Sequence, residues 1–425
     1  MNYIYKTVDE IIDACYNHLQ SNEVSGKRWG LPYHFYKPAN TKYGSSQWLW
    51  DSGWHMIVWA HRNVNNSVKD LRTMLQFQKP NGFIPEMIFW ENHSGLFAKL
   101  KDKLFGYSNE KYTDITQMPM LAYSVRAIWN ATKNKDLSEE FVPKLINYFE
   151  WWEEARDPDN DGLVSIIHPW ESGIDASPLY DPVWGVEDPS FWQLYPKFLI
   201  ALRKYKKKAE WDLSRILEMN YFNVEDVGLN SVYAAGWGEL GDLARKFDPD
   251  LAAMCKEKQE KFSSAIIDKC WSEKEGQFVS FYHTPSGEYV SKIETVQSLF
   301  PLLLDNLPHN ILEQVVRNLK NHEKFWLQYP VPSTAKSEPT FDPHESRLLW
   351  RGPTWPCTTW LVMEGLLNHN YKQLANEILN RWVEMYKKNG IYEYHNPLTG
   401  EGEGERGLGM STTIVDMIYR LRKVK

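Results

Sequence analysis

Cysteine is scarce in this chain, with four residues among 425: Cys15, Cys255, Cys270 and Cys357. No two of them form a Cys-x-x-Cys pair, so neither a disulfide framework nor a cysteine-rich zinc site is indicated. We expect isolated, buried thiols. The first ten residues also lack the apolar segment of a secretory signal. Together these absences predict a reducing, cytoplasmic location.

Several other features are missing, and each absence excludes a class of function. The net charge of -7 provides no basic excess for general nucleic-acid binding. No apolar run approaches the roughly 18 residues needed for a membrane helix. The chain has no His-Glu-x-x-His motif, no P-loop and no dinucleotide fingerprint, so we expect neither a metal nor a cofactor. With 43% hydrophobic and 24% charged residues, the composition is that of a folded globular protein.

Strand patterns are few, and helical periodicity dominates. One hairpin is predicted, from strands over 277–282 and 289–293. Apolar residues spaced three and four apart predict helices over the following ranges: 8–19, 51–63, 67–78, 114–132, 138–156, 189–206, 209–219, 229–247, 250–272, 294–303, 309–319, 355–367, 371–388 and 411–421.

This helix content predicts an all-α fold with one minor β-hairpin. No composition shift or flexible linker divides the chain, so we expect a single domain over residues 1–425. Paired helices in this number suit an (α/α)6 toroid, whose loops at one end would carry the chemistry. The helix count alone does not distinguish a toroid from an irregular bundle or a solenoid, although the absence of a fixed repeat disfavours a solenoid.

Aromatic residues are abundant: 20 Trp, 23 Tyr and 18 Phe. Several tryptophans stand beside acidic residues and glycine, as in Trp48-Leu49-Trp50-Asp51. An apolar ring with carboxylates at its edge complements a sugar, which has a C–H face and a rim of hydroxyls. The pattern therefore indicates a sugar-binding pocket.

Residues 168–178, His-Pro-Trp-Glu-Ser-Gly-Ile-Asp-Ala-Ser-Pro, have neither a helical nor a strand period. Prolines bound this short loop, which contains two carboxylates, and a loop held in this way can present Asp175 rigidly. The alternative is that Asp175 only caps a turn with Ser177.

A second candidate is Glu393, which lies between two tyrosines in Tyr392-Glu393-Tyr394. Glycine at alternate positions from 402 to 409 predicts a mobile flap after it, because such a segment has little to pack. Glu401, Glu403 and Glu405 are expected to form a solvated charge run. Each is nevertheless a rival for any role given to Glu393.

Three other residues fit an acidic, aromatic pocket, and each has a structural alternative. Asp51 opens a predicted helix and could be its N-cap. Arg351 could donate to a substrate oxygen or form a structural ion pair. Gln117 stands at a predicted helix start and could bind a hydroxyl.

The Asp157–Asp161 turn matches the first half of a calcium loop. His168 stands where the loop requires a bidentate Glu, so a tight acidic turn is the preferred interpretation over a calcium site.

Taken in order, these blocks resemble glycoside hydrolase family 63, which shares a clan with trehalases. The similarity runs from about residue 43 to 418 and rests on five segments: Trp48-Leu49-Trp50-Asp51-Ser52, Thr116-Gln117-x-Pro119, Trp170-Glu171-Ser172-Gly173-Ile174-Asp175-Ala176-Ser177-Pro178, Trp350-Arg351-Gly352-Pro353-x-Trp355 and Glu393-Tyr394-x-Asn396-Pro397-x-Thr399-Gly400. Ala176 departs from the family's usual Asn, and Met410 from its frequent Trp.

The resemblance implies an (α/α)6 catalytic domain and an inverting, exo-acting hydrolase of α-linked sugars. Asp175 would be the general acid and Glu393 the general base, with carboxyls about 6.5–9.5 Å apart to leave room for water. By motif position, the sugar subsite would comprise Trp48, Asp51, Gln117, Trp170, Glu171, Gly173, Trp350, Arg351, Gly352 and Trp355.

Within the family, the chain resembles the small members that hydrolyse glucosylglycerate or mannosylglycerate. Arg351 and Arg406 could hold a glycerate carboxylate. An α-glucosidase or trehalase, a sugar isomerase or epimerase on the same barrel, and a non-catalytic sugar-binding module remain as alternatives. The expected partner is thus a small sugar glycoside, not a nucleic acid or a membrane. The sequence leaves open gluco or manno selectivity and the oligomeric state.

Overall fold

The computed structural model describes residues 3–40, 46–91, 109–344 and 348–422, and these residues are mostly helical. The predicted helices are present with shifted ends. The longer ones are α1 (Val8–Ser21), α2 (Leu49–Trp59), α3 (Val64–Leu75), α5 (Leu121–Thr132), α6 (Lys135–Arg156), α8 (Phe191–Lys204), α10 (Val227–Ala244), α11 (Pro249–Ala265), α12 (His309–Leu319), α13 (Pro356–Asn368), α14 (Lys372–Asn389) and α15 (Ile414–Arg422).

Shorter helical turns connect them. They are η1 (Pro169–Ser172), η2 (Pro178–Tyr180), α7 (Asp181–Trp184), η3 (Tyr205–Ala209), α9 (Leu213–Met219), η4 (Ile266–Cys270), η5 (Val296–Leu303) and η6 (Gly409–Thr413). None of the described helices is both long and apolar enough to cross a membrane.

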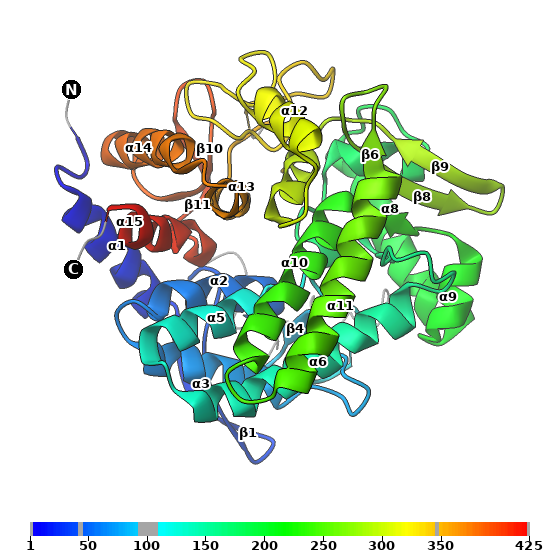
Figure 1. The fold of residues 1–425 in the computed structure, drawn as a ribbon, viewed down its shortest axis with the longest axis horizontal. Coiled ribbons are helices and arrows are strands. Elements are labelled where there is room, and N and C mark those ends of the chain that lie inside the picture. Colours follow the sequence, from blue (N-terminus) through cyan, green and yellow to red (C-terminus); the bar gives the residue numbers. More distant parts are fainter. Residues whose placement is uncertain (1–2, 41–45, 92–108, 345–347, 423–425) are drawn as a thin grey trace.

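The contacts between helical segments follow the order of the chain. Among the described residues, α2 contacts α5, α5 contacts α10, α10 contacts η5, η5 contacts α13, α13 contacts η6, and η6 contacts α2 again. Figure 1 shows the chain passing around the molecule in this order, with both termini on the same side. These contacts bring the start and end of the chain together, so distant loops can meet.

Burial differs between the helices in this cycle and those packed outside it. Every residue of α2 is buried, which suits a helix surrounded by protein. Helix α12 instead buries one stripe, which includes Ile311, Val315 and Leu319, and it packs against η5 and β7. The buried apolar side chains join into one continuous core.

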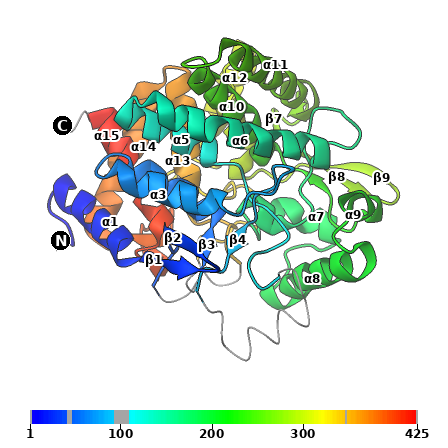
Figure 2. The same ribbon diagram turned by 90° about the horizontal axis from the view of Figure 1, so that it is seen from below.

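Strands are more numerous than the single predicted hairpin. That hairpin is present, but its strands are β8 (Ser280–Thr284) and β9 (Gly287–Ser291), and β5 (Val224–Glu225) adds a third strand. In Figures 1 and 2 this sheet lies on the side of the molecule opposite the termini. The remaining pairs were missed: β1 (Glu23–Arg28) with β2 (Leu31–Tyr36), β3 (Gln47–Trp48) with β4 (Met87–Ile88), β6 (Trp271–Ser272) with β7 (Gln277–Phe278), and β10 (Tyr392–His395) with β11 (Gly402–Arg406).

The prediction of isolated buried thiols is confirmed, since all four cysteines are free and buried.

Candidate active site

The loop that contains Asp175 is held by its own short-range hydrogen bonds. The His168 side chain accepts from the Trp170 N–H, and Ser172 Oγ donates to the carbonyl of Pro169 at 2.7 Å. Gly173 adopts φ +71°, and an added Cβ would come within 3.0 Å of the Trp50 ring. A side chain would thus be strained at Gly173. The loop therefore presents the half-buried Asp175 from a fixed backbone.

Glu393 lies in β10 and is only 2% exposed. Its Oε2 accepts a hydrogen bond from the backbone N–H of Glu405 at 2.9 Å. Glu405 belongs to β11, the strand that pairs with β10. The expectation of little packing was therefore wrong for 402–406, because backbone pairing does not require side chains. The mobility of the flap stays a prediction.

Burial separates Glu393 from its three rivals. Glu401 is exposed, and Glu403 and Glu405 are half-buried, whereas the Glu393 carboxyl is enclosed. Enclosure strengthens electrostatic interactions and excludes bulk water from a reacting group. Glu393 is thus the member of this group best placed for chemistry.

Three carboxyls from distant segments interact electrostatically. Burial and the negative charge of Glu393 raise the pKa of Asp175 to about 7. Burial, followed by the charges of Glu393 and Asp175, raises the pKa of Asp51 to about 8. Asp51 Oδ1 has no hydrogen-bond partner among the described residues. Carboxyls with raised pKa values, here Asp175 and Asp51, can hold a proton near neutral pH and release it to a substrate.

The sequence suggested Asp51 as the N-cap of its helix, but Asp51 does not have this role. It occupies the first turn of α2, whose N-cap is Trp48, and its side chain is 4% exposed. The reason is that α2 begins at Leu49, two residues earlier than predicted. The Asp51 carboxyl is consequently free to interact with the carboxyls of Glu393 and Asp175.

Glu86, which sequence analysis missed, belongs to the same group. It is 1% exposed, and neither carboxyl oxygen has a hydrogen-bond partner among the described residues. Burial, then the charges of Asp175 and Glu171, hold its pKa well above the ordinary value. The segment Ile84-Pro85-Glu86 has no periodicity that would have singled it out. Only its backbone pairing, in which Leu49 donates to the Glu86 carbonyl, brings it beside α2.

Aromatic rings stack on Tyr394, the residue that follows Glu393 in β10. Trp350 and Trp355 are parallel with centroids 3.6 Å apart, and Trp355 lies 4.5 Å from the ring of Tyr394. Trp350 has φ +73°, a conformation that a bulky residue adopts only when its surroundings enforce it. Gly352, between them, allows the chain to pass Asp342, whose carbonyl oxygen would be 2.3 Å from an added Cβ. Trp48 and Trp170 are half-buried.

Several predicted subsite residues make structural contacts. Arg351 donates from both Nη atoms to the buried carboxylate of Asp181, at 2.6 and 2.7 Å. The alternative of a structural ion pair is therefore confirmed for Arg351. Gln117 lies in the loop before α5 instead of at the helix start, and its Oε1 accepts from the Trp50 N–H. Arg406 is exposed. Burial has the largest effect on the pKa values of Tyr5 and His18, and the positive charge of Arg406 acts to lower both.

Glu171 is likewise bound to protein. Its carboxylate accepts from both Nη atoms of Arg156, at 2.6 and 2.9 Å, and both side chains are fully buried. The backbone N–H groups of Thr116 and Ile167 also donate to it. Glu171 thus links the end of α6 to the loop of Asp175.

This arrangement predicts a large stability defect for Glu171→Ala, because the variant leaves the Arg156 charge buried without its partner. We expect the free energy of unfolding to fall by about 3–5 kcal/mol, measured by urea denaturation. The matched control is Arg156→Met combined with Glu171→Leu, which removes both charges and should cost less. Wild-type stability with lost substrate affinity in Glu171→Ala would instead make Glu171 a sugar ligand.

The Asp157–Asp161 turn is satisfied by protein groups. The two oxygens of Asp157 accept from the N–H groups of Asp161 and Gly162. Lys269 pairs with the Asp161 carboxylate. The interpretation as a tight acidic turn is the one these contacts support.

Comparison with known proteins connects this geometry to an enzyme family. The model of the mannosylglycerate hydrolase MGH1-like glycoside hydrolase domain matches residues 44–411. The chain belongs to this family. It is a glycoside hydrolase, and the resemblance to glycoside hydrolase family 63 is confirmed.

Individual relatives of this glycoside hydrolase agree with that assignment. A mannosylglycerate hydrolase of Thermus thermophilus is 27% identical over 407 residues, covering 89% of this chain and 95% of its own. Glucosylglycerate hydrolase of Mycolicibacterium hassiacum is 26% identical, covering 84% and 88%. The crystal structure of a family 63 mannosylglycerate hydrolase from Thermus thermophilus with glucose matches with a TM-score of 0.81 at 26% identity, covering 96% and 99%.

Proposed function

We propose that this enzyme hydrolyses a small α-glycoside of glycerate, glucosylglycerate or mannosylglycerate, with inversion at the anomeric carbon. The observation that carries the proposal is that the charge of Glu393 helps to raise the pKa of Asp175, although the two carboxyls belong to distant segments of the chain. The names of the similar enzymes support the substrate class.

In this mechanism Asp175 is the general acid. A glycosidic oxygen is a poor leaving group until it is protonated, so the acid must keep its proton near neutral pH. Burial and the charge of Glu393 raise the pKa of Asp175 to about 7, which supports that role. Proton transfer to the glycosidic oxygen accompanies cleavage of its bond to the anomeric carbon, and glycerate leaves.

Glu393 is the general base. It removes a proton from a water that attacks the anomeric carbon from the face opposite the leaving group. The hydrogen bond from the Glu405 N–H to Oε2 orients the carboxylate toward that water. The first product is then the β-anomer of the released sugar, with the configuration inverted.

We also propose that the cycle of helical contacts forms an (α/α)6 toroid, in which α2, α5, α10, η5, α13 and the η6–α15 segment are wrapped by the others. The whole chain would act as one catalytic domain. In such a closed ring the loops after successive helices meet at one end, which accounts for the interaction of Asp175 with Glu393. The continuous hydrophobic core supports this arrangement.

The sugar would bind among the aromatic and polar groups around the acidic group. Trp48 and Trp170 retain some exposed surface and would offer their apolar faces, whereas the buried stack of Trp350, Trp355 and Tyr394 would support the pocket from behind. Asp51 would bind hydroxyls, and Gln117, Gly173 and Gly352 would shape the pocket. Glu171 and Arg351 would act indirectly, through their ion pairs with Arg156 and Asp181.

A substrate panel with product analysis tests the proposal. We expect hydrolysis of α-glucosylglycerate or α-mannosylglycerate with kcat/KM at least about tenfold above that for trehalose or maltose, and NMR of the first product should show the β-anomer. A preference for trehalose would make the enzyme a trehalase. Release of the α-anomer would contradict the separation of about 6.5–9.5 Å that inversion requires of the two carboxyls. Rearrangement of free sugars without glycoside cleavage would indicate an isomerase.

A further inference from the structure

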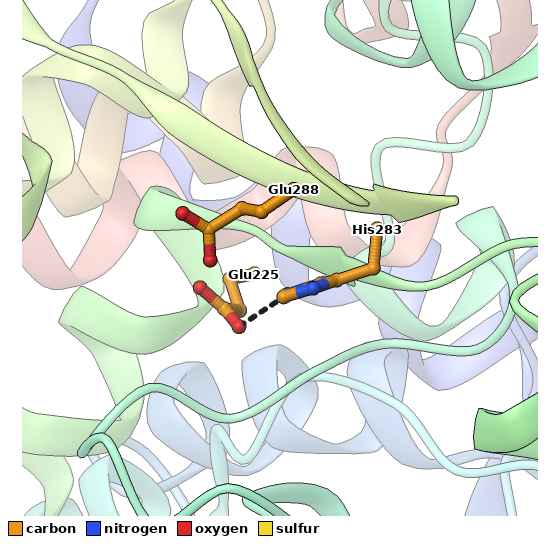
Figure 3. A group of neighbouring side chains, drawn as sticks. All are labelled: Glu225, His283 and Glu288. Carbon is orange, nitrogen blue, oxygen red and sulfur yellow. Dashed lines mark hydrogen bonds and ion pairs between the residues drawn. The ribbon is translucent and has the colours of Figure 1, made fainter. Parts of the chain in front are cut away.

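We propose that Glu225, His283 and Glu288 form a binding site for a divalent transition-metal ion, represented by Zn²⁺. The three residues lie in the sheet β5–β8–β9, and none of them is among the carboxyls proposed to act on the substrate. His283 and Glu288 are directly opposite each other in the β8–β9 hairpin, and Glu225 lies in the adjacent strand β5. Figure 3 shows the three side chains converging from these strands.

The donor atoms are close enough to share one ion. One ligand atom from each residue lies within 4.8 Å of the others. His283 Nε2 and Glu225 Oε1 are 2.6 Å apart. In a tetrahedral zinc site with ligand distances of 2.0–2.1 Å, two ligand atoms stand about 3.3 Å apart. Binding therefore requires these two atoms to separate by less than an ångström.

An independent observation comes from the second oxygen of Glu225. The residue is 2% exposed, and its Oε2 has no hydrogen-bond partner among the described residues. In Figure 3 the Glu225 carboxylate faces the carboxylate of Glu288. A buried carboxylate oxygen without a donor is costly, and a like charge opposite it increases that cost. A cation between the two carboxylates removes both penalties.

The surroundings favour a cation over an anion. Asp159 and Asp161 add negative charge near Glu225. The neighbouring ammonium of Lys269 pairs with Asp161 instead of with Glu225 or Glu288. Within the described residues, the site thus combines several carboxylates with one lysine that is already engaged.

The chemistry of the donors selects the metal. An imidazole nitrogen with carboxylate oxygens suits Zn²⁺ and related transition metals, whereas Ca²⁺ and Mg²⁺ prefer oxygen donors alone. The site opens onto a surface cavity of about 430 Å³, whose lining includes Asp159, Asn223, Glu225 and His283. The cavity gives an ion a path to the site and leaves room for a water as the fourth ligand.

An ion here would stabilise the segment beneath the loop of Asp175. Val224, next to Glu225, pairs with Ile166, which shortly precedes that loop. Helix α10 begins at Val227, with Asp226 as its N-cap. An ion that links the β8–β9 hairpin to β5 would therefore restrain β5, which pairs with Ile166 before the loop of Asp175 and leads directly into α10. The role is structural, and the proposal does not depend on the substrate of the enzyme.

The test uses Glu288→Ala, which removes one ligand and leaves the His283–Glu225 contact intact. Glu288 is exposed and faces a like charge, so in EDTA the variant should unfold at or slightly above the wild-type temperature. Isothermal titration calorimetry of the full-length, chelator-treated protein with ZnCl₂ should show one Zn²⁺ per chain. We expect Glu288→Ala to weaken that affinity at least about tenfold, and His283→Ala to abolish binding. The matched control is the exposed Glu273→Ala, which should bind like wild type.

Thermal unfolding provides a second measurement. The unfolding temperature of wild type should rise with Zn²⁺ concentration, because an ion that binds the folded state stabilises it. Glu288→Ala should show a smaller rise at each concentration. The proposal is overturned if wild type does not bind Zn²⁺ at about 100 µM or below, an order-of-magnitude threshold for a specific site. It is equally overturned if Glu288→Ala binds as tightly as Glu273→Ala, or if Ca²⁺ binds more tightly than Zn²⁺.

Discussion

Asp175→Asn is expected to lower kcat for the preferred glycosylglycerate by about 10²–10⁴-fold, the usual contribution of a positioned general acid. Asparagine has nearly the same shape but no acidic proton, so the dissociation constant for the substrate should change little. Single-turnover kinetics and calorimetric binding measure the two quantities separately. The control is Asp268→Asn, an exposed aspartate on η4.

Dependence on the leaving group makes this test specific for proton donation. An aryl glycoside whose phenol is acidic departs without protonation, so Asp175→Asn should hydrolyse it with less than about a tenfold loss. Equal losses for aryl glycosides and glycosylglycerates would mean that Asp175 orients the sugar instead of protonating the leaving oxygen.

The titration of Asp175 predicts how activity falls on the alkaline side of the pH profile. Because burial and Glu393 raise the pKa of Asp175 to about 7, the carboxyl is protonated below that pH and loses its proton above it. The value of kcat/KM should therefore fall as pH rises through about 7 in wild type. Asp51, with a pKa of about 8, is also protonated in this range. Asp51→Asn should keep the alkaline fall, whereas Asp175→Asn should lose it.

How far the sequence could predict this site depends on the range of the forces involved. Asp175 stands in a loop with its own turn and proline signals, and such local features are readable from neighbours in the chain. The partners of charged residues are not local. Arg156 with Glu171, and Arg351 with Asp181, are brought together only by tertiary packing. The sequence analysis therefore placed Glu171 and Arg351 in the sugar subsite without indicating the ion pairs that they form with Arg156 and Asp181.

Strand β11 illustrates a different limit. Glycine at alternate positions indicated a flap, because glycine offers no side chain to pack. In the structure Gly404 has φ +71°, and an added Cβ would be 2.7 Å from Glu393 Oε2. Glycine is thus required there so that the backbone can approach the carboxylate. Close backbone approach and flexibility have the same signature in a single sequence, and only the partner strand distinguishes them.

Glu393→Gln should lower kcat by a similar factor, about 10²–10⁴-fold, since glutamine cannot take a proton from water. In contrast to Asp175→Asn, the loss should be as large for an activated aryl glycoside as for a glycosylglycerate, because both need an activated water. Glu403→Gln is the matched control: it lies on β11, opposite Tyr394 in the same ladder, and carries the same substitution. Its kcat should stay within about threefold of wild type.

If Glu403→Gln were inactive and Glu393→Gln active, the general base would be Glu403 on β11 instead of Glu393 on β10.

Glu393→Ala then distinguishes a base from a merely structural carboxylate. If Glu393 activates water, removing its side chain leaves space in which a small anion such as azide can attack without deprotonation. Azide should restore turnover of the aryl glycoside and yield the β-glycosyl azide, because attack still comes from the face opposite Asp175. A structural defect offers azide no such route, so an inactive Glu393→Ala that azide does not rescue, with its unfolding temperature lowered, would remove Glu393 from the mechanism.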